Sequence, residues 1–79
     1  MEMLTPHQID RIYAITDGLA LHRNAVIVPL KARESGFERI MPDGRLLIIG
    51  PGNVDFEDWF DGLNERVTRM DLGRARHMV

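Results

Sequence analysis

Apolar residues recur at helical spacing in a first stretch near the beginning of the chain. On a wheel drawn at 100° per residue, one side collects Ile9, Ile12, Tyr13, Thr16, Leu19 and Ala20. The preceding Thr5-Pro6-His7-Gln8 is a capping box with proline at the first helical position. We therefore predict a helix from Pro6 to about His22, with Asp17-Gly18 as the alternative, earlier end.

A second helical stripe lies near the other end of the chain. The residues that fall within an arc of about 100° are Phe56, Trp59, Phe60, Leu63, Val67 and Met70. Asn53 or Asp55 can cap the helix, and Leu72-Gly73 is expected to end it. The remaining residues, 74–79, are short and basic and are expected to fray.

The middle of the chain has the composition of β-strands. Residues 25–30, AVIVPL, are rich in β-branched residues and predict a strand that has Pro29 near its end or at a sheet edge. Pro42-Asp43-Gly44 predicts a hairpin turn between strands at about 37–41 and 45–49. The whole chain, residues 1–79, is thus predicted to be a single α+β domain, αβββα, with two helices on one face of a three-stranded sheet. The strand order stays open, because the first strand can pair with either of the others.

The third strand differs from the others because it is apolar on both sides. Leu46 and Ile48 point one way, and Leu47 and Ile49 point the other. Two helices on one face would leave the second apolar face uncovered. Leu47 and Ile49 are a candidate secondary interface, together with the two arginines that flank the hairpin turn, Arg39 and Arg45.

The second helix also carries a concentration of acidic residues. Glu57, Asp58, Asp61 and Glu65 fall on the side opposite Trp59 and Phe60. Acids in a first turn are also favoured by the helix dipole, so a merely solvated face is the alternative to a binding face. The like-charge pairs at i, i+4 slightly destabilise an isolated helix, which favours a basic partner.

Gly62 lies beside these acids in the predicted helix. A glycine there costs about 1 kcal/mol relative to alanine, unless another backbone approaches closely or the helix bends. Gly62→Ala is therefore expected to stabilise the free protein. Glu57, Asp58, Asp61, Gly62 and Glu65 are the predicted partner-binding residues.

Composition restricts the function further. The chain of 79 residues has no cysteine, which removes disulfide frameworks and thiol catalysis, and its net charge is −2. Such a charge disfavours direct nucleic-acid binding, which needs a basic surface. No apolar run approaches the length of about 20 residues that spans a membrane, and the first ten residues lack the features of a signal peptide. We expect a cytoplasmic protein.

Residue spacing indicates neither catalysis nor a cofactor. The three histidines, His7, His22 and His77, are too far apart in sequence to suggest a metal site, and Ser35 has no nucleophile motif around it. The glycines of IGPGN precede a helix, but the loop lacks the lysine and hydroxyl of a phosphate-binding loop. We expect no catalytic residue, no metal and no cofactor, and hence no enzyme.

The favoured hypothesis is a small protein-binding protein, an inhibitor or adaptor, whose acidic helix face occupies a basic protein partner. One version is mimicry of nucleic acid, as in phage-encoded inhibitors of host-defence or nucleic-acid-handling complexes. The alternatives are a homodimer or other homo-oligomer that buries Leu47 and Ile49, or Leu46 and Ile48, against a second copy, and a nucleic-acid-binding module that uses the hairpin arginines. Salt separates the first two, because charge mimicry weakens with ionic strength and apolar association does not.

Overall fold

The computed structural model describes residues 3–33, 35–52 and 54–77. Its elements follow the predicted order of helix, strand, hairpin and helix, with shorter helical pieces added. In chain order they are α1 (Pro6–Gly18), η1 (Arg23–Ala25), β1 (Val26–Ile27), β2 (Phe37–Ile40), β3 (Leu46–Ile49), α2 (Phe56–Asp61), α3 (Leu63–Thr68) and α4 (Gly73–Arg76).

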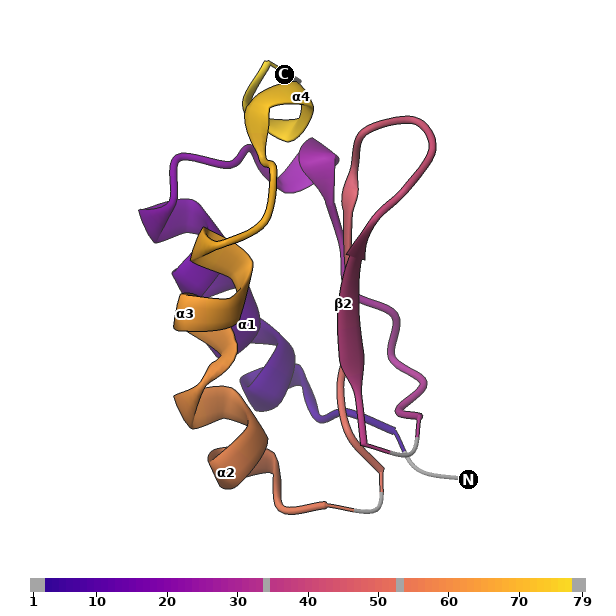
Figure 1. Ribbon diagram of the computed structural model, residues 1–79. Helices are drawn as coiled ribbons and strands as arrows, with labels where there is room; N and C mark the ends of the chain where they lie inside the picture. Colours follow the sequence, from indigo (N-terminus) through magenta and orange to yellow (C-terminus); the bar gives the residue numbers. More distant parts are fainter. Residues whose placement is uncertain (1–2, 34, 53, 78–79) are drawn as a thin grey trace.

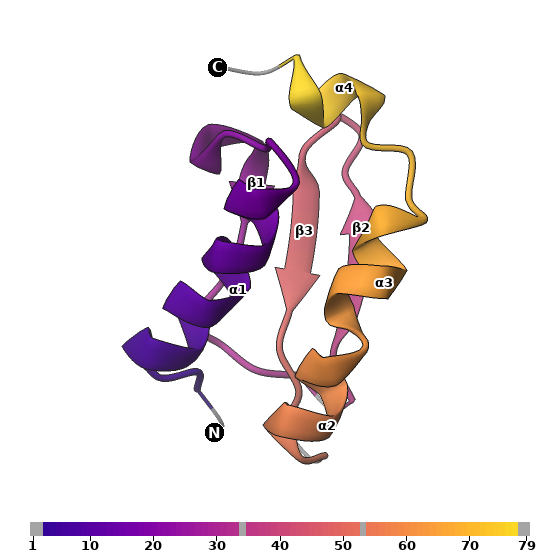
Figure 2. The ribbon, with the colours of Figure 1, turned by 90° about the vertical axis from the view of Figure 1, so that its left-hand side faces the viewer.

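The helices and the sheet form two layers. Figure 1 shows α1, α2 and α3 on one side of the strands and, among the described residues, no helix on the other side. The strand order is β1-β3-β2, in which β3 pairs parallel with β1 and antiparallel with β2. Seen from the helix side in Figure 2, α1 lies toward β1, and α2 and α3 lie toward β2. The predicted α+β class, with helices on one face of a three-stranded sheet, is confirmed.

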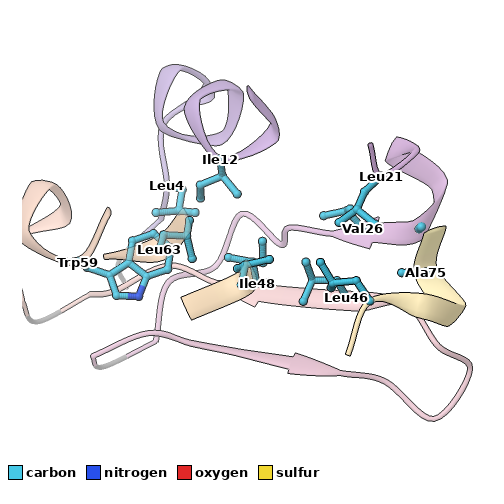
Figure 3. Packing of buried hydrophobic residues seen from close by; sticks show 12 residues of the cluster. Leu4, Ile12, Leu21, Val26, Leu46, Ile48, Trp59, Leu63 and Ala75 are labelled. Atoms are coloured by element: carbon cyan, nitrogen blue, oxygen red, sulfur yellow. The ribbon is translucent and has the colours of Figure 1, made fainter. Parts of the chain in front are cut away.

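The hydrophobic core fills the space between these layers. Figure 3 shows Ile12 of α1, Leu63 of α3 and Ile48 of β3 pointing toward one another, and each is fully buried. The predicted alternation along β3 places Leu46 and Ile48 on the helix side (Figure 3), which the sequence had left open. Leu4, which precedes α1, also reaches the core.

The first helix ends earlier than the favoured prediction of His22. It begins as predicted, because Thr5 and Gln8 form both bonds of the capping box. It ends at Gly18, where the Ala20 N–H donates to the Asp17 carbonyl and the Leu21 N–H donates to the Thr16 carbonyl, each at 3.1 Å. This pair of bonds is a Schellman motif, and it satisfies carbonyls that would otherwise be left free. Leu19 and Leu21 still pack inward after the turn, so the apolar stripe outlasts the helix.

Ala20 occupies the left-handed position of this motif, with a φ of 63°. An L-residue with a Cβ is strained there, and glycine is not. We expect Ala20→Gly to stabilise the fold by about 1 kcal/mol, measured by urea unfolding. Because Ala20 is exposed, the substitution leaves no cavity that would offset the gain. A loss of stability would contradict the assignment of strain to this residue.

The sheet is shorter at its first strand than predicted. β1 comprises only Val26 and Ile27, because Ala25 belongs to η1 and the chain leaves the ladder before Pro29. The hairpin follows the prediction closely. Gly44 has a φ of 95°, and the Met41 N–H donates to the Arg45 carbonyl at 2.7 Å across the turn.

The second helix is divided at Gly62, which is the bend that its sequence allowed. Asp55 caps α2 by accepting from the Glu57 N–H at 2.8 Å, whereas Asn53 lies outside the described residues. The helical segment also ends before the predicted Leu72-Gly73, because α3 ends at Thr68.

The predicted frayed tail is corrected over the residues that the structure describes. Residues 73–76 form α4, and the Ala75 side chain is buried against the core. Arg74 donates to the Pro42 carbonyl at 3.1 Å and so ties the tail to the hairpin turn. Residues 78–79 of the predicted tail lie outside the described part.

Candidate protein-binding surface

The four predicted acidic residues lie on α2 and α3, in the helical layer that faces the viewer in Figure 2. Glu57, Asp58 and Asp61 belong to α2, and Glu65 belongs to the first turn of α3. All four are exposed. The break in the helix at Gly62 therefore lies between Glu65 and the other three acidic residues. We call these four residues the acidic face.

One member of the acidic face is paired with an arginine from the first helix. The Arg11 guanidinium donates two hydrogen bonds to the Glu57 carboxylate, one of them from Nη2 to Oε1 at 2.9 Å. The same guanidinium lies 4.4 Å from the centre of the Phe60 ring, a cation–π contact. Arg11 thus joins α1 to α2 by charge and by stacking.

This pair changes the acidity of both partners. Hydrogen bonding to Arg11 lowers the pKa of Glu57 below its ordinary value, and the coulombic attraction of Arg11 lowers it further. The bond to Glu57 likewise raises the pKa of Arg11, with smaller contributions from the charges of Glu57 and Asp61. Arg11 therefore remains charged over the whole pH range in which Glu57 titrates.

Glu57 should make the stability depend on pH. Because its pKa is lower in the folded state than in the unfolded chain, its contribution is present at neutral pH and is lost as the pH falls through the folded-state value, below about 4.5. A double-mutant cycle of Arg11→Gln and Glu57→Gln, followed by urea unfolding, should give a favourable coupling energy at pH 7 that disappears in acid. A coupling energy that does not change with pH would contradict this origin.

The remaining acids of the face differ in their partners. Glu65 accepts a bond from Arg69 at 2.5 Å, an i, i+4 pair on the surface of α3. Among residues 3–33, 35–52 and 54–77, neither Asp58 nor Asp61 is in an ion pair with a basic side chain. The charge available to a partner is therefore concentrated at Asp58 and Asp61.

Gly62 is covered by a side chain of its own protein. The Arg66 side chain passes over it to reach Glu38 of β2 at 2.8 Å and the Trp59 carbonyl at 3.0 Å. A Cβ at residue 62 would come within 2.6 Å of Arg66 Nη1. The gain expected from Gly62→Ala is therefore reduced by the movement that it forces on Arg66. The close approach to Gly62 is made by Arg66, without need of a second chain.

A groove runs beside the acidic face, between α1 and the two helical pieces α2 and α3. Its volume is about 460 Å³, and the residues that line it are Arg11, Ala14, Ile15, Gly18, Leu19, Phe60 and Asn64. Ile15, Leu19 and Phe60 are half-buried and pack against the core from outside. The groove therefore has a largely apolar floor that packs against the buried core.

The predicted secondary interface lies on the other side of the molecule. In the ladder Arg39 is opposite Leu47 and Phe37 is opposite Ile49, so these side chains share the sheet face without helices. Phe37 is 42% exposed, whereas Ile49 is only 6% exposed. Arg45 forms an ion pair with Asp43 at 3.1 Å. The usable surface there consists mainly of Phe37, Arg39 and Leu47.

Sequence reasoning missed two features of this surface. Arg11 was not among the predicted site residues, because its pairing with Glu57 requires the two helices to lie side by side. Phe60 was predicted to be core, but it is half-buried and lines the groove. The exposed i, i+4 pair of small residues, Ala14 and Gly18, was a signal that could have indicated a groove on α1.

Comparison with known proteins adds nothing to these observations, because the chain matches no family model, no curated protein and no solved structure. Across the described ranges, no three acidic or histidine side chains are grouped closely enough to hold a metal ion. The same part of the chain contains no helix with the length and hydrophobicity needed to cross a bilayer.

Proposed function

We propose that this chain is a small non-enzymatic protein that binds a basic surface of a protein partner through the acidic face of α2 and α3. The observation that carries the proposal is that Asp58 and Asp61 are exposed and without an ion-pair partner in the described ranges, on a helix whose Phe60 lines an apolar groove. Carboxylates attract and orient a basic partner, and an adjacent apolar surface supplies the burial that makes binding stable.

The action of such a protein would be to occupy its partner. A domain of 79 residues that presents a row of carboxylates can compete with nucleic acid for a basic groove, which is the way that nucleic-acid mimics inhibit. Phage-encoded inhibitors of host-defence complexes are one class that works in this manner. An adaptor that joins two proteins would use the same acidic face.

The test compares two charge-reversal variants that have the same net charge. In the first, Asp58→Lys and Asp61→Lys alter the acidic face. In the control, Asp43→Lys and Asp71→Lys alter the hairpin turn and the segment before α4, away from α2 (Figure 1). Circular dichroism checks that both variants fold.

Tagged wild-type protein and both variants are used to capture proteins from a cell lysate at low and at high salt, with identification by mass spectrometry. We expect a basic partner that is lost with the first variant, kept by the control, and released as salt rises. Retention of the same partner by the first variant would refute the proposal.

A second candidate function is self-association through the open sheet face. It is favoured by the exposure of Phe37 on a sheet that has helices on only one side. Light scattering at increasing protein concentration tests it, with Leu47→Glu as the disrupting variant. A monomer at all concentrations would exclude this candidate.

A further inference from the structure

We infer that the groove between α1 and α3 seats an amphipathic, basic α-helix of the partner. This inference rests on the proposed function and specifies which element of the partner is bound. It depends on three properties of the groove: its shape, its floor and the charge along its walls.

The shape suits a helix. The groove follows α1 from Arg11 to Leu19, which is about 12 Å at 1.5 Å per residue. A helix has a diameter of about 10–12 Å, and it docks into an apolar groove through residues spaced at i, i+3 or i+4 and i+7. Two turns of a partner helix therefore match the length of the groove.

The floor permits close approach of a second backbone. Ala14 and Gly18 are one turn apart on α1 and both are exposed, and a Cβ built at Gly18 meets no other atom within 4 Å. Small residues at this spacing let a helix lie close against α1, while Ile15, Leu19 and Phe60 offer apolar contact. Of the described residues that line the groove, Arg11 and Asn64 have polar side chains, and Arg11 is already bonded to Glu57. A small polar ligand would find few groups to orient it.

The walls select a basic helix. The helices that supply the lining residues carry six carboxylates: Asp10, Asp17, Glu57, Asp58, Asp61 and Glu65. Glu57 is bonded to Arg11 of the lining, and the negative charge of Asp61 also acts on Arg11. Three of the six carboxylates are paired with Arg23, Arg11 or Arg69. Asp10, Asp58 and Asp61 have no ion pair within the described ranges, so the helices that form the groove carry unpaired negative charge. Lysines or arginines at the edges of an apolar helix stripe would be attracted by this charge.

The experiment uses an 18-residue synthetic peptide of leucine and lysine. In the test peptide the leucines are spaced at i, i+3, i+4 and i+7, and in the control peptide the same residues are arranged so that no apolar stripe forms. Each is titrated at low salt into the ¹⁵N-labelled protein and followed by NMR. We expect the test peptide to shift the amides of Ala14, Gly18 and Asn64.

Variants that fill the groove make the test specific. Gly18→Leu and Ala14→Leu each place a side chain where the partner helix would lie, and either should weaken binding of the test peptide at least tenfold. His7→Leu, which is exposed in the first turn of α1 outside the lining, should leave the affinity unchanged. Equal binding by both groove variants, or shifts confined to another surface, would overturn the inference.

The remaining outcomes separate this inference from the proposed function. If both peptides bind equally and the double variant Asp58→Lys, Asp61→Lys binds neither, the proposal of a basic partner is supported. The inference that the groove binds a helix is then refuted. If neither peptide binds, the inference of a helix in the groove fails, while the capture experiment still tests the proposed function separately. If the groove amides shift with protein concentration alone, a second copy is the occupant, and the inference is overturned.

Discussion

Replacement of Gly36 by alanine should lower the free energy of unfolding by about 2–4 kcal/mol. Gly36 has a φ of 73°, and a Cβ there would lie 2.8 Å from the Ile49 carbonyl oxygen and 2.9 Å from Trp59 Nε1. Two costs add, because an L-residue is strained at this φ and the neighbouring backbone cannot move aside as a flexible side chain can. Gly36 thus lets the segment before β2 lie against the end of β3. Urea unfolding measures the loss.

Gly18→Ala is the matched control for this substitution. It adds the same methyl group, but at a residue in helical conformation that has open space around it. Because alanine favours helix over glycine, the control should raise stability by up to about 1 kcal/mol. Equal effects of the two substitutions would mean that the close contacts of Gly36 do not exist in the folded protein.

The parts of the fold that the sequence predicted are those that depend on local chemistry. The capping box at Thr5 and Gln8, the turn at Gly44 and the two-sided strand around Ile48 each involve a few neighbouring residues. The errors arose where tertiary packing decides. The apolar stripe continues beyond Gly18, but the helix has ended there and the chain turns at Ala20. The predicted second helix is divided at Gly62, where the Arg66 side chain crosses toward Glu38.

The candidate site was only partly predictable for a similar reason. The acidic face follows from helical spacing within one segment, so Asp58 and Asp61 could be placed from sequence. The groove is formed between α1 and α3, and the Arg11–Glu57 pair joins residues that are 46 positions apart. The hydrophobic periodicity of either segment does not reveal this contact, because the contact depends on how both helices pack on the sheet.

Truncation of Leu63 to alanine should cost about 3 kcal/mol. Leu63 is fully buried at the start of α3, and it lies with Ile12 and Ile48 where α1, α3 and β3 meet (Figure 3). Its loss removes apolar contact and leaves a cavity that fully buried neighbours cannot easily fill. A domain of this size has a total stability of about 4–12 kcal/mol, so the variant should melt about 12–24 °C lower in calorimetry.

Leu30→Ala provides the same chemical change at the surface, because Leu30 is 52% exposed. It should alter stability by less than about 0.5 kcal/mol, since little apolar area is lost and no cavity forms. The contrast tests the two-layer arrangement directly. If Leu63→Ala and Leu30→Ala had similar effects, Leu63 could not lie between the helices and the sheet. A large cost for Leu30→Ala alone would instead indicate that another molecule covers the surface around Leu30.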